Sequence, residues 1–314
     1  MVKLPTIEDA LSVANKADPT DVEAYNAADV LVSWGYLDLA DRLLDRLRPH
    51  QKYAGPVNRL AAASRQLRRS GILEEVTALD RSGVRIDGRH EAYTARHQEG
   101  SDKVIIVFTG LGPRFWLSLM VLHGFLKRLN THIIYLTDLR HLIFFDGLET
   151  VARGYHGLYD ALAETVRSLG ARDVHVMGNS AGGFVALRYA IDLRAKSFLG
   201  ASIRTDLSPT SQLPIARFFD GAPLDAFPHM KIDLKPLLAA SRWPERVILY
   251  CGEDNPVDLP HAMHLAGLPN VEVTMLGGYM NHDVIAGLLG RGLFETVLQH
   301  FLDPGPIAEP VRRI

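Results

Sequence analysis

The sequence predicts an α/β fold, in which a mostly parallel sheet carries helices on both faces and a small all-helical extension precedes it. Compact apolar or β-branched runs recur from residue 104 onward, and helical patterns lie between most of them. Strands that are apolar on both faces are typical of a parallel sheet covered by helices on both sides. The first 73 residues contain no convincing strand and place apolar side chains at helical spacing. The predicted parallel strands are 104–110, 132–138, 174–180, 197–203, 246–252 and 271–278.

Composition indicates a soluble globular protein. Of the 314 residues, 47% are hydrophobic and 22% are charged, which is enough to bury a sizeable core in one large domain with a smaller one attached. A net charge of -2 gives no general field for attracting nucleic acid. Cys251 is the only cysteine, so an intrachain disulfide and a cysteine-based metal site are excluded.

Charged side chains occupy the first 21 residues, where a secretory signal would need an uninterrupted apolar core. No later stretch reaches transmembrane length free of charge. We therefore expect a cytoplasmic protein that neither crosses nor binds a membrane.

The helical extension, residues 1–73, shows one internal recurrence. Leu31 and Gly35 recur 36 positions later as Leu67 and Gly71. This pattern resembles a tetratricopeptide helix pair, although that repeat has about 34 residues and needs at least three copies for a self-supporting array. The resemblance implies a possible protein partner for these helices. The alternative is a generic helical extension that lies on the main domain.

The main domain is predicted to span 74–303, with 304–314 as a C-terminal tail. At its start, residues 74–80 and 84–98 alternate apolar and polar side chains, as half-buried antiparallel strands do. We expect a hairpin there.

A sharp turn joins the strand at 174–180 to a helical pattern at 184–193. The turn reads Gly178-Asn179-Ser180-Ala181-Gly182, a G-x-S-x-G motif between a strand and a helix. The tight turn requires that the residues two before and two after the serine lack side chains. Ser180 is therefore expected to expose its hydroxyl at the carboxyl edge of the sheet, where active sites of such folds lie.

In this context the motif resembles the nucleophile elbow of the α/β-hydrolase family, whose catalytic triad follows the chain order serine, acid, histidine. The resemblance implies a histidine after the last parallel strand. His282 stands there, between the run at 271–278 and a helical pattern, and is the expected general base. The resemblance also implies an acid after the run at 246–252.

Two aspartates compete for the role of the acid. The family commonly has aspartate three residues after the glycine that ends this strand, but Asn255 occupies that place here. Asp254 lies one residue earlier and Asp258 three residues later; we favour Asp254 because it is close to the strand end. The carboxylates not used are expected to cap the next helix. Lesser candidates for the acid are Glu253 and Asp206.

The oxyanion hole needs two backbone amides that point at the oxygen on which charge develops. The first expected donor is the amide of Ala181, and the family analogy picks the amide of Leu111, after Gly110, as the second. Related enzymes often begin this loop with histidine, and here Thr109 replaces it.

The acyl group of the substrate is expected to lie against Asn179 and the loop of Gly110. Residues 204–243 form a predicted short lid that is rich in apolar side chains, which favours an apolar or aromatic acyl group. The lid side chains expected to bind substrate are Leu213, Phe218 and Phe219.

No cofactor or metal is expected. The sequence lacks a P-loop and a dinucleotide-binding fingerprint. His261 and His264 can share one face of a helix, but the sequence marks no third metal ligand.

These features predict a serine hydrolase that cleaves a carboxylic ester or thioester of a small-molecule acyl substrate through an acyl-enzyme on Ser180. One alternative is an acyltransferase or amidase with the same triad. The other is a catalytically idle scaffold that binds a partner through its N-terminal helices.

Overall fold

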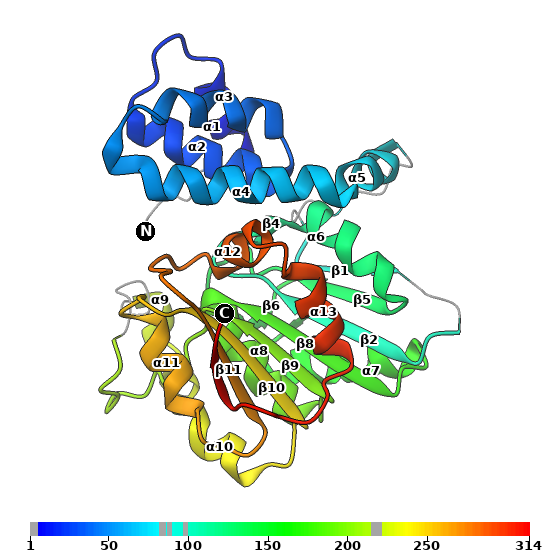
Figure 1. The fold of residues 1–314 in the computed structure, drawn as a ribbon. Coiled ribbons are helices and arrows are strands. Elements are labelled where there is room, and N and C mark those ends of the chain that lie inside the picture. The colour runs from blue at the N-terminus through cyan, green and yellow to red at the C-terminus, as the bar shows by residue number, and fades with distance from the viewer. Residues whose placement is uncertain (1–5, 82–85, 87–89, 97–99, 215–221) are drawn as a thin grey trace.

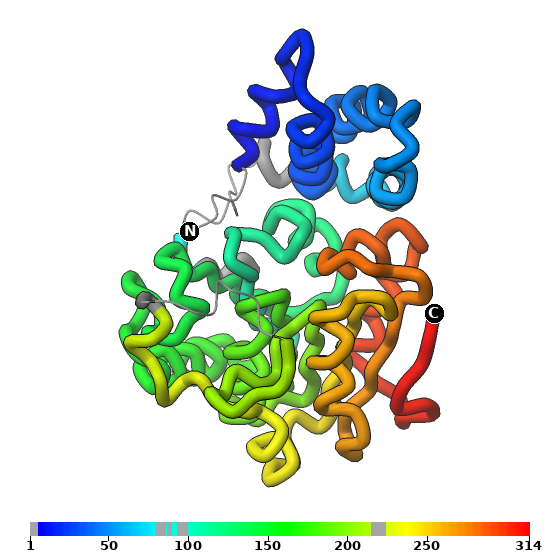
Figure 2. The backbone as a smooth tube through the Cα atoms, turned by 90° about the vertical axis from the view of Figure 1, so that its left-hand side faces the viewer, coloured from blue at the N-terminus to red at the C-terminus, as the bar shows by residue number. Residues whose placement is uncertain are grey.

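The computed structural model describes residues 6–81, 86, 90–96, 100–214 and 222–314 of the chain (Figure 1). An all-helical layer, formed by α1–α5 and called the N-terminal layer below, lies over one end of a sheet domain (Figures 1 and 2). Within the described residues, no helix combines the length and apolar character needed to cross a membrane.

The helices of the N-terminal layer begin and end at recognisable capping residues. Thr20 and Glu23 form a capping box at the start of α2, because each side chain accepts the backbone amide of the other. Gly35 and Gly71 end α2 and α4 in the left-handed conformation, with φ of 81° and 70°. The glycine recurrence in the sequence therefore marks two helix ends, while a tetratricopeptide array stays a prediction. The helices are α1 (Ile7–Ala14), α2 (Asp21–Trp34), α3 (Leu37–Leu47), η1 (Gln51–Tyr53), α4 (Ala54–Ser70) and α5 (Ile72–Arg81).

The strand expected at 74–80 is wrong, because these residues lie in helix α5. Ile72 and Val76 occupy the same face of α5, and both pack against Gly124 of α6. This segment fits the strand and the helix period equally, and packing against α6 decides between them. Of the second expected strand, Ala92–Arg96 forms β1, which pairs antiparallel with β5; residues 82–85, 87–89 and 97–99 lie outside the described residues. The domain boundary at residue 73 stays a prediction.

The predicted α/β architecture is confirmed. One eight-stranded sheet has the order β1-β5-β2-β8-β9-β10-β11-β12, and every neighbouring pair except β1 and β5 is parallel. All six predicted runs contain strands of this sheet. The strands are β1 (Ala92–Arg96), β2 (Lys103–Phe108), β5 (His132–Leu136), β8 (Asp173–Asn179), β9 (Ser197–Ala201), β10 (Arg246–Gly252), β11 (Val271–Leu276) and β12 (Val311–Arg313).

Helices and two small antiparallel pairs complete the sheet domain. The short pairs are β3 (Arg114–Phe115) with β4 (Leu117–Ser118), and β6 (Gly147–Leu148) with β7 (Ala152–Arg153). The helices are α6 (Leu119–Leu126), η2 (Lys127–Leu129), α7 (Tyr155–Ser168), α8 (Ser180–Asp192), α9 (Ala222–Asp225), η4 (Pro228–Met230), α10 (Leu234–Ala240), α11 (Asp258–Leu265), α12 (Val284–Gly290) and α13 (Phe294–Leu302).

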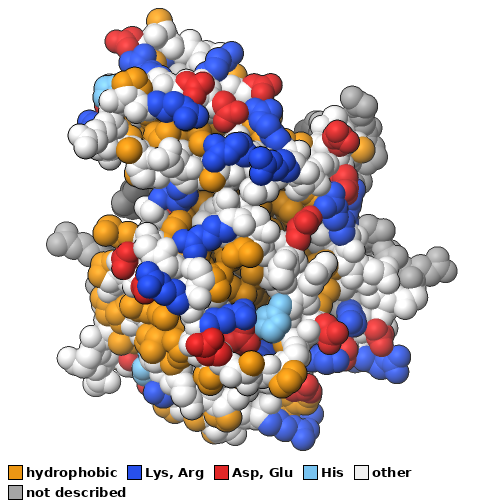
Figure 3. Space-filling model, in the orientation of Figure 1, with side chains coloured by type: hydrophobic (Ala, Val, Ile, Leu, Met, Phe, Trp, Pro, Cys, Tyr) orange, Lys and Arg blue, Asp and Glu red, His pale blue; other side chains and the backbone are white. Residues whose placement is uncertain are grey.

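The two faces of the sheet carry separate cores. Along β2, Ile105 and Val107 belong to the core that includes α6, α12 and α13, whereas Ile106 and Phe108 belong to the core with α7, α8 and α11. The first core continues without a break into α1–α4. The outer face of the N-terminal layer visible in Figure 3 carries basic and acidic side chains interspersed, with no field of one sign.

Candidate active site

The turn from β8 into α8 holds Ser180 in a strained conformation. The backbone φ of Ser180 is 52°, a value that residues other than glycine rarely adopt. A Cβ on Gly178 would lie 2.6 Å from the Cα of Gly183, and a Cβ on Gly182 would lie 1.9 Å from the carbonyl oxygen of Thr109. Only glycine therefore fits at the two positions that flank the turn, as the sequence motif predicts.

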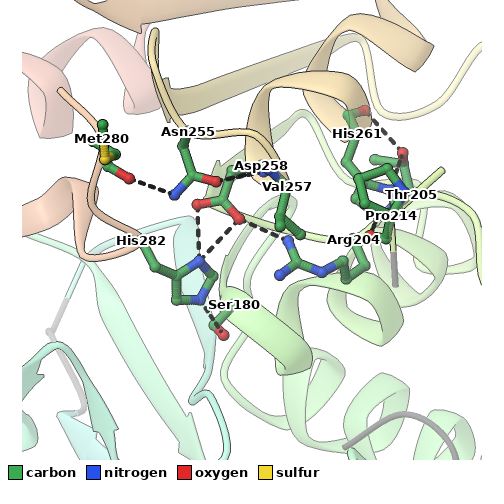
Figure 4. A network of polar contacts seen from close by, with 10 residues as sticks. All are labelled: Ser180, Arg204, Thr205, Pro214, Asn255, Val257, Asp258, His261, Met280 and His282. Atoms are coloured by element: carbon green, nitrogen blue, oxygen red, sulfur yellow. Dashed lines mark hydrogen bonds and ion pairs between the residues drawn. The ribbon is translucent and has the colours of Figure 1, made fainter. Parts of the chain in front are cut away.

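The structure brings Ser180 and His282 together. The Oγ of Ser180 lies 2.7 Å from the Nε2 of His282, which comes from the loop between β11 and α12 (Figure 4). The His282 side chain is 45% exposed, so a substrate and water can reach it. The distance suits the transfer of a proton from the hydroxyl to the imidazole.

The acid that contacts His282 is Asp258, so the prediction that Asp254 takes this place is wrong. The Nδ1 of His282 lies 2.9 and 2.8 Å from the two carboxylate oxygens of Asp258, which is 1% exposed. Asp254 is exposed, and its backbone amide donates to the carbonyl of Tyr279. Asp258 was the alternative acid of the sequence analysis.

Asn255 explains why Asp258 can reach the histidine. Its Oδ1 accepts the amides of Val257 and Asp258 at 3.0 and 2.8 Å, and its Nδ2 donates to the carbonyl of Met280 at 2.9 Å. The chain therefore turns immediately after β10, and α11 begins at Asp258 itself. The expectation that a spare carboxylate caps this helix is also wrong, because an amide side chain takes that place. The residue that departs from the family pattern is the one that sets the turn.

Arg204 is a site residue that the sequence analysis did not identify. It follows β9, and its Nη1 donates to Asp258 Oδ1 at 2.8 Å, with both side chains nearly fully buried (Figure 4). Burial alone would raise the pKa of Asp258, but the hydrogen bond and charge of His282, followed by those of Arg204, lower it. The only signal in the sequence is a basic residue just after a strand that ends at the active edge.

We predict that Arg204→Met destabilises the protein at neutral pH and makes its stability depend less on acid. Because the folded-state pKa of Asp258 is lowered, its stabilising effect is complete above the ordinary carboxyl value of about 4 and is lost as the pH falls through the lower folded value. Removal of Arg204 raises this pKa toward the unfolded value, so Tm should fall less steeply on acidification, and its difference from the wild-type Tm should shrink as the pH falls. Loss of one partner of a buried pair should also cost about 3 kcal/mol at pH 7.

Thermal unfolding between pH 3 and 7 measures both effects. The matched control is Arg246→Met, since Arg246 pairs with Glu272 at the amino end of its strand and is 13% exposed. An acid profile of Arg204→Met that matches the wild type would contradict the assigned charge pairing.

The loop after β2 borders the serine, as expected. A Cβ on Gly110 would lie 3.5 Å from the Cβ of Ser180 and 3.5 Å from the Nδ2 of Asn179. The amide of Ala181 lies in the first turn of α8, where helix amides have no intrahelical acceptor. His141 Nδ1 donates to the carbonyl of Leu111 at 2.7 Å. The roles of Ala181 and Leu111 as oxyanion donors stay predictions.

The predicted lid is described only in part. Leu213 is half-buried, and its amide donates to Ser211 Oγ at 3.2 Å, whereas Phe218 and Phe219 lie outside the described residues. His261 accepts the amide of Thr205 at Nδ1 and donates from Nε2 to the carbonyl of Pro214, at 3.2 and 3.1 Å. Burial lowers the pKa of His261 to about 4, so it is neutral and anchors this segment to α11. The lid and its contacts with substrate stay predictions.

His264 has two carboxylate neighbours that the sequence analysis did not recognise. Asp206 and Asp233 face each other in an isolated bridge, and single ligand atoms of the three residues lie within 4.8 Å of one another. His264 Nε2 lies 2.8 Å from Asp233 Oδ1, and backbone amides of Ser208 and Lys235 donate to the two aspartates. Internal hydrogen bonds account for this cluster, and Asp206 is not placed against His282.

A family model described as the alpha/beta hydrolase family matches residues 105–279, more than half of the chain. Among solved structures, MenH from S. aureus is 14% identical, with a TM-score of 0.46 over 68% of this chain and 97% of that chain. A carboxylesterase structure from Nitrososphaera gargenis is 15% identical, with a TM-score of 0.43 over 67% and 93%. The capsule O-acetyltransferase of Neisseria meningitidis serogroup A is 16% identical, with a TM-score of 0.42 over 64% and 88%. No curated protein matches the sequence.

Proposed function

We propose that this chain, which belongs to the α/β hydrolase family, is a serine hydrolase that cleaves a carboxylic ester or thioester through an acyl-enzyme on Ser180. One observation carries the proposal: an unbroken line of hydrogen bonds runs from Ser180 Oγ through both ring nitrogens of His282 to the buried carboxylate of Asp258. This is the arrangement in which a hydroxyl becomes a nucleophile near neutral pH.

Each residue of this line has a defined task. Asp258 accepts a hydrogen bond from the protonated Nδ1 of His282. The lone pair of Nε2 is then directed at the Ser180 hydroxyl. His282 takes the hydroxyl proton as Oγ bonds to the acyl carbon, and returns it to the leaving alcohol or thiol. Water then attacks the acyl-enzyme, giving its proton to His282, and Ser180 is released with its proton restored.

The surroundings of Ser180 suit the tetrahedral intermediate. The amides of Ala181 and Leu111 supply the two donors, and the N-terminus of α8 adds a favourable field for a developing oxyanion. A Cβ on Gly110 would be in van der Waals contact with Ser180 and Asn179, so the loop that carries the second donor lies directly beside the nucleophile.

The same triad would also serve acyl transfer to another acceptor, or amide cleavage, because both begin with the same acyl-enzyme. The exposed face of His282 favours water as acceptor. An apolar or aromatic acyl group, a cytoplasmic location, the absence of nucleic-acid and membrane binding, and a partner for the N-terminal helices stay predictions.

Labelling with a fluorophosphonate probe tests the proposal. Wild type should be labelled, and Ser180→Ala should not, because the probe reacts only with an activated serine. Ser168→Ala is the matched control, since Ser168 is an exposed serine at the end of α7 whose hydroxyl donates to a backbone carbonyl. An unreactive wild type, or equal labelling of Ser180→Ala, would favour the idle scaffold instead.

A further inference from the structure

The N-terminal layer packs on the two helices that follow the catalytic loops. Gly290 of α12 is so close to α4 that a Cβ on it would lie 3.2 Å from the Cβ of Ala62. Gly124 of α6 is even closer to α5, since a Cβ there would lie 2.6 Å from a methyl of Ile72. Helix α6 continues from the oxyanion loop through β3 and β4, and α12 continues from His282. The layer therefore contacts both the helix that follows the oxyanion loop and the helix that follows His282 (Figures 1 and 2).

Asp29 of helix α2 contacts the segment that follows the oxyanion loop. Trp116 Nε1 donates to Asp29 Oδ1 at 3.1 Å, and the guanidinium of Arg114 lies 3.8 Å from Asp29 Oδ2. Arg114 also donates to Ser33 Oγ on the same helix, at 3.2 Å. Trp116 is buried with a φ of 57°, a strained conformation that needs support from its surroundings.

The backbone of Arg114 passes this restraint directly to the oxyanion loop. Its carbonyl accepts the amide of Gly110 at 3.3 Å, and its own amide donates to the carbonyl of Gly112 at 2.7 Å. Leu111, whose amide is the second proposed oxyanion donor, lies between these two bonds. Fixing the Arg114 side chain on α2 therefore fixes the orientation of the Leu111 amide.

Arg59 of helix α4 contacts the residues on both sides of His282. Its Nη2 lies 3.5 Å from Asp283 Oδ2, and its guanidinium lies 5.6 Å from the centre of the Tyr279 ring. The Tyr279 hydroxyl donates to the carbonyl of Asp283 at 2.8 Å, so these two residues close a loop around His282. Arg59 is 10% exposed, and it also donates to the hydroxyl of Tyr25 on α2.

We propose that the N-terminal layer is part of the active-site framework, with Asp29 and Arg59 as positioning residues for the oxyanion loop and the His282 loop respectively. The inference rests on the proposed function of Ser180. A rigid layer that touches both loops keeps the oxyanion donor and the base at a fixed separation, which catalysis requires to within a fraction of an ångström.

Full-length variants of Asp29 test the oxyanion half. Asp29→Ala should slow fluorophosphonate labelling and kcat by about ten- to a hundredfold with little change in KM, because an oxyanion donor acts in the transition state. Hydrogen exchange should rise in peptides covering 109–116. Asp29→Asn should recover most of the rate, since its amide oxygen can still accept from Trp116.

Asp41→Ala is the matched control for Asp29→Ala. Asp41 accepts from Ser64 and Arg68, so its partners lie within the N-terminal layer and its loss should lower Tm without changing the rate. Arg59→Met should raise exchange at 279–284 and lower kcat, with Arg59→Lys intermediate. Arg68→Met is its control on the same helix, since Arg68 pairs with Asp38 and Asp41.

The two proposals fail in different ways. If wild type neither labels nor hydrolyses esters, the proposed function fails, and hydrogen exchange still decides whether Asp29 and Arg59 hold the loops. If Asp29→Ala and Arg59→Met keep the wild-type rate and exchange, the framework proposal is overturned while Ser180 catalysis stands. Equal losses in Asp41→Ala and Arg68→Met would mean that the layer acts only through global stability, which also overturns it.

Discussion

Asp258→Asn should lower kcat for a short acyl ester by up to about 10⁴-fold, by analogy with the same change in serine proteases. Asp258 accepts the Nδ1 proton of His282 through either carboxylate oxygen. An asparagine can present its amide hydrogens to Nδ1, and this favours the tautomer that carries its proton on Nε2. That nitrogen could then no longer accept the proton of the Ser180 hydroxyl. Steady-state kinetics at pH 7 measures the loss.

Asp254→Asn is the matched control, because Asp254 is four residues away, exposed, and tied to Tyr279 only through its backbone amide. It should keep near-normal turnover. Asp258→Asn also removes the charge that faces Arg204, and this should lower stability. The Tm of each variant therefore shows whether a lower rate comes from unfolding or from the loss of the catalytic acid. A crippled Asp254→Asn beside an active Asp258→Asn would reverse the assignment of the acid.

Much of the fold was predictable because its signals are local. The strands of the parallel sheet are apolar on both faces, so compact runs such as 104–110 and 246–252 stand out against the helical patterns between them. The elbow is equally local, since Gly178 and Gly182 are required by backbone contacts within a single turn and with the adjacent loop. His282 could be placed because it follows the last long strand of the sheet.

The acid could not be placed from spacing alone. Whether Asp254 or Asp258 reaches the histidine depends on the side chain of Asn255, which joins α11 to the loop of Met280 through hydrogen bonds on both sides. The hydrogen bond between Asn255 and Met280 joins residues 25 positions apart, and such a contact produces no pattern in the sequence. The helix at 74–80 was missed for the same reason, because α6 supplies the packing that selects helix over strand there.

The contacts of the N-terminal layer lie even further apart along the chain. Asp29 and Trp116 are 87 residues apart, and Arg59 reaches Asp283 from the opposite end of the sequence. The spacing of apolar side chains predicted a helical segment, but only the fold shows that two of its charged residues face the catalytic loops. Arg204 was missed likewise, since a single arginine after a strand is ordinary until its carboxylate partner is known.

His282→Ala should lower kcat/KM for a short acyl ester by at least about a thousandfold, because members of a triad act as one unit. His282 is the base that lies 2.7 Å from the Ser180 hydroxyl, so its loss removes the group that accepts the serine proton and the group that activates water on the acyl-enzyme.

Steady-state kinetics at pH 7 on both proteins measures the loss. The matched control is His300→Ala: His300 on α13 also contacts a buried acid, Glu272, at 3.1 Å, and Glu272 in turn pairs with Arg246, so the cluster repeats the chemistry of the site away from Ser180. It should keep the wild-type rate. If His282→Ala retains more than a tenth of the wild-type rate, His282 is not the base, and the hydrogen bond it forms with Ser180 serves structure alone.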